Sequence, residues 1–242
     1  MTHTQVVRHL DAAALAHNTA SRLLDRVLAL QANGGRATLC LTGGRTLLAV
    51  YAELGELLTN APVDPARLDL WWGEEGFIGT PEPERIATRT LAALAGSFAL
   101  DPAHTHPMPG SEGYLDAAAA ADSYAKELGD TRFDVCLLGI GGLGQVASLF
   151  PGHPAARSSS KVAAVLDSPL PPSERLSLTA SALSDATEVW CLARGEDKAE
   201  ALRLALDGDP RSPAARVRGR DATTFLVDRA AASLLPYHRC DL

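Results

Sequence analysis

Two glycine-rich segments of this sequence could bring the backbone close to a bound anion. The first, TGGRT at 42–46, lies between an apolar run of strand length at 37–41 and a helical pattern at 46–58. Glycines let a ligand approach the backbone, and the first turn of a helix offers free amides and the positive end of its dipole. A tight turn without a ligand would look the same. The segment matches neither glycine pattern of the nucleotide-binding loops, so we expect no nucleotide cofactor.

The second segment, GIGGLGQVAS at 139–148, follows an apolar run at 133–139 and has four glycines in its first six positions. One turn needs fewer glycines, which favours close packing of this backbone around a ligand. The segment contains no general base for neutral pH, because neither Gln145 nor Ser148 titrates there.

Two adjacent carboxylates, Glu74 and Glu75, come directly after the apolar run at 68–72. At a strand end they could orient a sugar hydroxyl or position a base. A solvated acidic loop is the alternative, and the residues alone favour it.

Two cations stand near predicted element ends. Arg175 follows a proline pair and could reach a ligand or form a surface salt bridge. Lys198 falls in the first turn of a predicted helix, where a cation opposes the dipole, so an anion nearby is expected. A phosphate could supply it, as could Glu196 or Asp197.

Apolar runs alternate with helical patterns along the chain. Beyond the runs already given, strands are expected at 161–166, 175–179, 187–193 and 222–227, and helices at 11–32, 85–96, 114–128, 196–206 and 228–235. Apolar strands alternating with helices predict an α/β fold with a mainly parallel, Rossmann-like sheet and helices on both faces. We expect a single domain over 1–242. Ligands of such sheets bind beyond the carboxyl ends of the strands, so the loops at 42–46, 73–79 and 139–148 should converge.

Composition excludes some partners. The net charge of −7 argues against a nucleic acid or an anionic membrane, although it leaves room for a small anion. The four cysteines form no C-x-x-C pair, which favours buried thiols over a metal site or disulfides. With no signal peptide pattern and no apolar run of membrane-spanning length, we expect a cytoplasmic protein without a metal or cofactor, either a monomer or a homodimer.

The order and spacing of these segments resemble the 6-phosphogluconolactonase family, which is related to the glucosamine-6-phosphate isomerases. Where that family has L-L-G-x-G-x-D-G-H-T-A-S-L-F-P-G, this chain has LLGIGGLGQVASLFPG at 137–152. PPSERLSLT at 171–179, GEDKA at 195–199, PAARV at 213–217 and FLVDRAAASLL at 225–235 also match the family's segments. The resemblance covers nearly the whole chain. It implies a 6-phosphogluconolactonase-like fold and hydrolysis of 6-phosphoglucono-1,5-lactone in the pentose phosphate pathway.

Carried over residue by residue, the resemblance implies a set of site residues. Gln145 and Glu75 fall at catalytic positions, and Gly43, Gly44, Arg45, Thr46, Glu74, Ser148, Arg175 and Lys198 at substrate- or phosphate-binding positions. Arg45 occupies a position where the family has a small residue, so it adds a cation to the predicted phosphate loop.

Other positions depart from the family. Its catalytic histidine falls on Gln145 and the following threonine on Val146, while the aspartate two residues before the histidine falls on Leu143. Its arginine after the two acids falls on Gly76, and an asparagine falls near Ile86. The phosphate side is therefore mostly kept, and the catalytic side mostly lost.

Glutamine can hold a water molecule but cannot accept its proton, and general-base assistance is worth about 10²–10⁴-fold in rate. We therefore expect a lactonase of weak or lost activity, in which Gln145 positions water and His153 or Glu75 stands in as base. The alternative is a non-catalytic relative that binds a sugar phosphate or a partner protein. Isomerase or deaminase chemistry is least favoured, because it needs an acid/base pair and a histidine in this loop.

Overall fold

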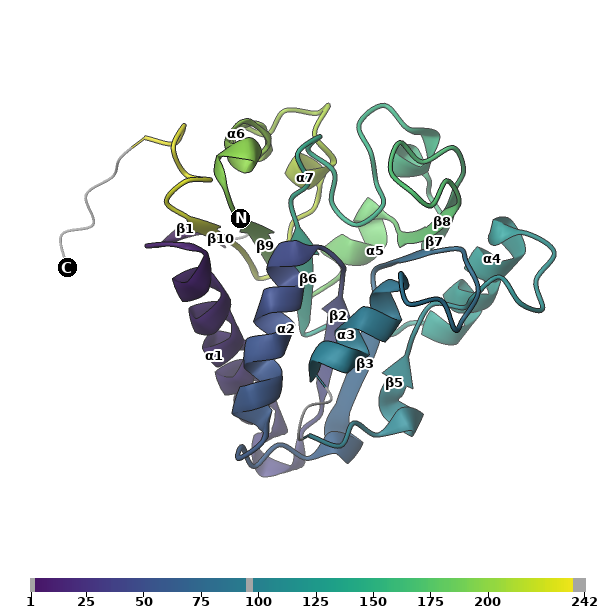
Figure 1. The fold of residues 1–242 in the computed structure, drawn as a ribbon, viewed down its shortest axis with the longest axis horizontal. Coiled ribbons are helices and arrows are strands. Elements are labelled where there is room, and N and C mark those ends of the chain that lie inside the picture. Colours follow the sequence, from purple (N-terminus) through teal and green to yellow (C-terminus); the bar gives the residue numbers. More distant parts are fainter. Residues whose placement is uncertain (1–2, 95–97, 237–242) are drawn as a thin grey trace.

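A computed structural model describes residues 3–94 and 98–236, and its centre is a seven-stranded sheet whose neighbouring strands are all parallel (Figure 1). The strand order is β1-β10-β9-β6-β2-β3-β5. These strands are β1 (His3–His9), β2 (Ala37–Leu41), β3 (Leu68–Trp72), β5 (Thr105–His106), β6 (Val135–Gly139), β9 (Glu188–Ala193) and β10 (Ala222–Asp228). The expected α/β fold with a mainly parallel sheet is thus confirmed.

Helices connect the strands. They are α1 (Ala12–Gln31), α2 (Arg45–Leu58), α3 (Ile86–Leu94), α4 (Ala117–Leu128), α5 (Ala180–Ser184), α6 (Ala199–Leu206) and α7 (Pro213–Arg216), with 3₁₀ turns η1 (Ala32–Gly34), η2 (Pro65–Arg67), η3 (Pro102–His104), η4 (Pro154–Arg157) and η5 (Glu196–Lys198). Figure 1 shows α1, α2 and α3 side by side over one face. The β2-to-β3 and β5-to-β6 crossovers run in opposite directions, so right-handed connections place α2 and α4 on opposite faces. None of the helices in the described residues is long and apolar enough to cross a membrane.

The strand order reverses between β2 and β6. From β2 the chain proceeds to β3 and β5, whereas from β6 it proceeds to β9 and β10 on the other side. The two strands are adjacent, with Cys40 opposite Cys136. Because the connections leave in opposite directions, a crevice forms beyond the carboxyl ends of β2 and β6, where such folds bind ligands.

A second, antiparallel sheet lies beside this crevice. It consists of β4 (Glu74–Gly76), β8 (Arg175–Leu178) and β7 (Val162–Val165), in the order β4-β8-β7. The strands expected at 161–166 and 175–179 therefore exist but stand outside the parallel sheet. Gly76 pairs with Arg175, so the acidic loop and the proline-led strand meet.

Two terminal elements differ from the expectations. Strand β1 was not predicted, because it lies at the sheet edge and none of its residues is fully buried. The helix expected at 228–235 is wrong: after β10 the chain forms turns over 229–234. The Asp228 carboxylate accepts the Ala231 amide at 2.7 Å, and Pro236 disfavours helical backbone at the residue before it.

Candidate functional site

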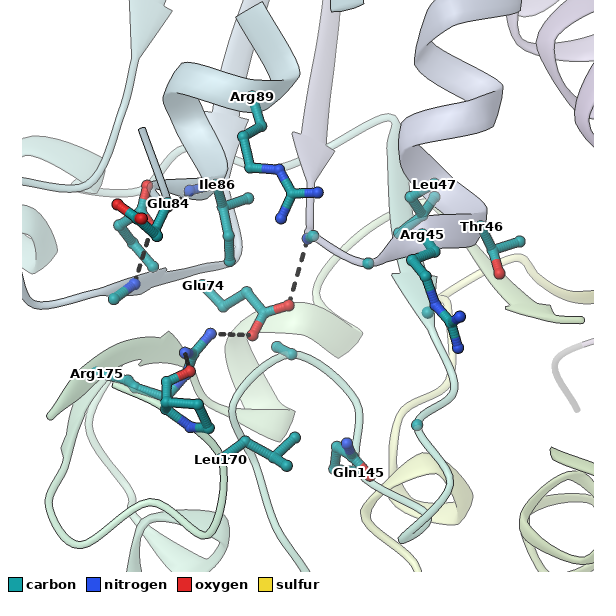
Figure 2. Close-up of a pocket in the computed structure, with 18 of the residues that line it drawn as sticks. Arg45, Thr46, Leu47, Glu74, Glu84, Ile86, Arg89, Gln145, Leu170 and Arg175 are labelled. Carbon is teal, nitrogen blue, oxygen red and sulfur yellow. Dashed lines mark hydrogen bonds and ion pairs between the residues drawn. The ribbon is translucent and has the colours of Figure 1, made fainter. Parts of the chain in front are cut away.

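A cavity with a volume of about 1230 Å³ opens at the reversal point. Figure 2 shows the pocket, which is lined by residues from the turn before α2, from β4, from the glycine-rich turn after β6, from the loop before β8 and from the segment after β9. The expected convergence of the loops at 42–46, 73–79 and 139–148 is confirmed.

The N-terminus of α2 faces this pocket without a side-chain cap. Its N-cap residue, Gly44, has φ 108°, a conformation that favours glycine, and the place of its missing Cβ is open space. Helices α1 and α4, in contrast, are capped by the carboxylates of Asp11 and Asp116. The first-turn amides of α2 and its dipole are therefore available to an anion.

A second uncapped N-terminus stands at the same pocket. Gly195, with φ 91°, precedes η5 and provides no side-chain cap. Lys198 Nζ lies 2.7 Å from Asp197 Oδ2, and this hydrogen bond is the main cause that lowers the pKa of Asp197. A Cβ at Gly142 would lie 3.2 Å from Lys198 Nζ, so the glycine leaves room for the lysine. Lys198 thus has an anion of its own and still lines the pocket.

Three arginines line the pocket without forming an ion pair with any described residue: Arg45, Arg89 and Arg194. Of these three arginines, only Arg45 was expected from the sequence. Arg194 directly follows β9, so the rule that binding residues follow parallel strands could have found it. Arg89 belongs to α3, and nothing in its local sequence distinguishes it from a surface arginine.

Glu74 is the centre of a hydrogen-bonded network on the β4 side. Its Oε1 accepts the Gly43 amide at 3.3 Å, and its Oε2 accepts the Ser148 hydroxyl at 2.7 Å and Arg175 Nη2 at 3.2 Å. Arg175 Nε donates to Ser148 Oγ at 2.6 Å. Ser148 is fully buried and lies outside the pocket lining, so it can affect a ligand only through Glu74 and Arg175.

Glu75 is buried and bonded to the protein on both oxygens. Oε1 accepts the amides of Gly76 and Ile86, each at 2.8 Å, and Oε2 accepts that of Ala87 at 2.9 Å, with Arg85 Nη2 at 3.5 Å. Burial raises the pKa of Glu75, while these hydrogen bonds oppose the rise. The carboxylate therefore caps α3, which the sequence did not indicate.

Gln145 lines the pocket opposite Arg89 (Figure 2). Its Oε1 accepts the Leu143 amide at 3.1 Å, and its side chain lies against Gly141, where a Cβ would come within 2.0 Å of Cδ. Two residues on, Ala147 has φ 48°, in the left-handed region that alanine seldom adopts. Strained backbone of this kind clusters at ligand sites.

His153 lies outside the pocket lining. Its Nδ1 accepts the Ala155 amide at 3.2 Å, so its Nε2 carries a proton and donates to the Leu166 carbonyl at 2.7 Å. Both ring nitrogens are thus engaged, which leaves no free lone pair to take a proton from water.

At two positions that depart from the resemblance, 76 and 86, side chains pack tightly against a glycine. A Cβ at Gly76 would lie 2.7 Å from Pro172 Cγ, and a Cβ at Gly43 would lie 2.9 Å from Ile86 Cδ1. Pro172 therefore occupies the space in which an arginine at 76 would begin. The side chain of Ile86, at the expected asparagine position, packs on the phosphate-loop glycine.

These features define a class of protein: a parallel α/β fold with a cation-lined crevice where the strand order reverses. Residues 10–226 match the family described as glucosamine-6-phosphate isomerases/6-phosphogluconolactonase, and the chain belongs to this family. A 6-phosphogluconolactonase from Streptomyces coelicolor is 44% identical over 96% of this chain and 95% of its own length.

Solved structures agree on the fold. The 6-phosphogluconolactonase from Trypanosoma cruzi superposes with a TM-score of 0.85 at 23% identity, over 98% of this chain and 99% of its own. A monomeric glucosamine-6-phosphate deaminase superposes with a TM-score of 0.80 at 22% identity, over 95% of this chain and 99% of its own. Because both activities share this fold, the fold alone does not select between them.

Proposed function

We propose that this chain hydrolyses 6-phosphoglucono-1,5-lactone to 6-phosphogluconate, at a rate limited by the lack of a histidine at position 145. The observation that carries the proposal is the uncapped N-terminus of α2, which opens into the pocket beside Lys198. The 44% identity to the Streptomyces coelicolor 6-phosphogluconolactonase supports lactone hydrolysis over the deaminase chemistry.

The phosphate binds at the N-terminus of α2. The donors there are the backbone amides of Gly44 and Arg45, the Thr46 hydroxyl and the Arg45 guanidinium. Lys198 approaches from η5. A dianionic phosphate gains from each of these charges and from the helix dipole. The sugar then extends toward Glu74, whose Oε1 carries only a long bond from the Gly43 amide and can accept a hydroxyl.

Gln145 holds the water molecule that attacks the lactone carbonyl. The water oxygen forms a bond to C1, the bond from C1 to the ring oxygen breaks, and the ring oxygen takes a proton to become a hydroxyl. The new acid group releases its proton to solvent. Gln145 can orient the water by hydrogen bonds but cannot take its proton, so the step lacks about 10²–10⁴-fold of general-base assistance. A lactone is an activated ester, so orientation alone sustains a slow rate.

Neither replacement base is favoured by its surroundings. Both carboxylate oxygens of Glu75 accept backbone amides, from Gly76, Ile86 and Ala87, and Oε2 also faces Arg85. His153 is outside the pocket lining, and its ring donates to a carbonyl. Glu75 and Ser148 act instead as positioning residues, Glu75 for α3 and Ser148 for Glu74 and Arg175.

A second function has one observation in its favour. Gln145 lines the pocket without a base beside it, and this arrangement is expected of a non-catalytic relative that only binds a sugar phosphate. Such a protein would use the same cationic pocket and release the ligand unchanged.

A lactonase assay at high enzyme concentration, coupled to detection of 6-phosphogluconate and corrected for spontaneous hydrolysis, separates the two. We expect a slow rate proportional to enzyme concentration and, at substrate concentrations below saturation, lowered about 10- to 100-fold by Lys198→Ala. Stabilisation of the fold by 6-phosphogluconate without any enzyme-dependent hydrolysis would favour the binding protein. Absence of both would refute the sugar-phosphate site.

A further inference from the structure

Arg89 is a pocket residue that neither the sequence pattern nor the proposed phosphate site uses. It is exposed and lines the pocket, and its side chain forms no hydrogen bond or ion pair with any described residue. Figure 2 shows its side chain extending from α3 into the pocket above Glu74, beside Ile86. Arg45 enters on the other side of the turn that joins β2 to α2.

The surroundings of Arg89 favour an ion pair with a carboxylate, yet its guanidinium forms none with the described residues. It stands in the fourth position of α3, near the positive end of the helix dipole, where a cation is unfavourable. Glu82 and Glu84 line the same pocket, and neither forms an ion pair with Arg89 within the described residues. Glu74, directly below it, is committed to Ser148 and Arg175. The guanidinium is left facing the space that a ligand would fill.

Apart from Arg175, which is bonded to Glu74, the cations that line the pocket fall in two separate positions. Arg45, Arg194 and Lys198 lie at the N-termini of α2 and η5, whereas Arg89 comes from α3. Gly76, which pairs with Arg175 and packs on Pro172, offers no further cation on the β4 side. A ligand with one phosphate would use the first position and leave Arg89 without a counter-charge.

We propose that Arg89 forms a second anion subsite, which binds the carboxylate of a sugar acid phosphate whose phosphate lies at the N-terminus of α2. The proposal rests on the proposed function for the phosphate position. A guanidinium presents paired donors in a planar fork that matches the two oxygens of a carboxylate. The lactone is uncharged at this end and the acid is not, so Arg89 favours the product over the substrate. Hydrolysis is therefore inhibited by its own product.

Calorimetric titration with three ligands tests this subsite: inorganic phosphate, glucose 6-phosphate and 6-phosphogluconate. Only the last carries a carboxylate. We expect the wild-type protein to bind 6-phosphogluconate about 10- to 100-fold more tightly than glucose 6-phosphate, the range of one charged hydrogen-bonded contact. Arg89→Gln should remove this difference and leave the affinities for phosphate and glucose 6-phosphate unchanged. Arg157→Gln, at an exposed arginine of η4 outside the pocket, is the matched control and should change none of them.

The outcomes distinguish the two proposals. Equal wild-type affinity for glucose 6-phosphate and 6-phosphogluconate, or a preference that survives in Arg89→Gln, overturns the carboxylate subsite and leaves the phosphate site standing. Failure of the wild-type protein to bind any of the three overturns the phosphate site, and the subsite with it. Because Arg89 is exposed, the melting temperature without ligand should be the same in all variants, which shows that a lost preference is not unfolding.

Discussion

The two sides of the pocket differ in how their polar groups are satisfied. On the side of α2 and η5, hereafter the helix wall, two helix N-termini have no side-chain cap, and Arg45 and Arg194 form no ion pair with any described residue. On the side of β4 and β8, the strand wall, the carboxylates of Glu74 and Glu75 are bonded to amides, a hydroxyl and arginines of the protein itself.

This difference separates ligand contacts from structural ones. A charged group that the fold leaves unpaired in a cavity gains most from a ligand, whereas a buried group with all its partners present loses them if it moves. The helix wall is therefore suited to hold a phosphate. Apart from Glu74 Oε1, which can accept a sugar hydroxyl, the strand wall fixes the shape of the pocket and the start of α3.

The largest effect is expected from Glu75→Ala, which would test the structural role of the strand wall. The change leaves the amides of Ile86 and Ala87 without an acceptor, and Arg85, which is 3% exposed, without its carboxylate. Removing one partner of a buried pair costs about 3–5 kcal/mol. Urea unfolding should show a loss of this size, while Glu84→Ala, at an exposed acid of the same pocket, should change the free energy of unfolding little. A stable Glu75→Ala variant would contradict the assignment.

The helix wall should show the opposite behaviour, a loss of binding without a loss of stability. Arg45→Ala and Lys198→Ala each remove a charged contact worth about 1.5–3 kcal/mol, or about 10- to 100-fold in the dissociation constant for inorganic phosphate. Lys126→Ala, at an exposed lysine in the last turn of α4, is the control. If Arg45→Ala and Lys198→Ala bind phosphate as well as Lys126→Ala does, the helix wall does not hold the anion.

A smaller effect is expected from Gly76→Arg, which restores the residue that the family resemblance leads one to expect. The new side chain begins 2.7 Å from Pro172 Cγ, and overpacking of this kind costs about 1–3 kcal/mol. Gly76→Ala should lose nearly as much stability, because the clash starts at Cβ. Gly139→Ala, whose Cβ would meet its neighbours at 3.5 Å or more, serves as the control in thermal unfolding. If Gly76→Arg is as stable as the wild-type protein, Pro172 moves aside at little cost, and the predicted clash is wrong.

Buried elements were predictable from sequence to within a few residues, and edge elements were not. Strands β2 and β3 were expected at 37–41 and 68–72, where they lie, because their residues are apolar throughout and buried in the sheet. Strand β1 was not predicted, because it is an edge strand that mixes polar and apolar residues without a buried face. The convergence of the loops after β2 and β6 followed from the rule for parallel sheets.

The roles of individual site residues depended on contacts that no local pattern contains. The bonds from Glu75 to the amides of Ile86 and Ala87 join residues more than ten positions apart. Ser148 does not line the pocket, because it is fully buried beneath Glu74 and Arg175, to which its hydroxyl is bonded. Arg89 could be distinguished from other surface arginines only once α3 was placed beside the turn that leads into α2.

The central claim is that the helix wall binds the substrate while the turn that carries Gln145 provides no base. The dependence of kcat/KM for lactone hydrolysis on pH, in the wild-type protein and in Gln145→His, tests it most directly. After correction for spontaneous hydrolysis, the wild-type profile should show no step near the ordinary imidazole pKa of about 6.5, whereas Gln145→His should gain that step. The gain in rate should stay below about tenfold, well short of full general-base assistance, because Gly76 and Leu143 still lack the arginine and carboxylate. A wild-type profile that already rises through this pH with fast turnover would contradict the account and require another base.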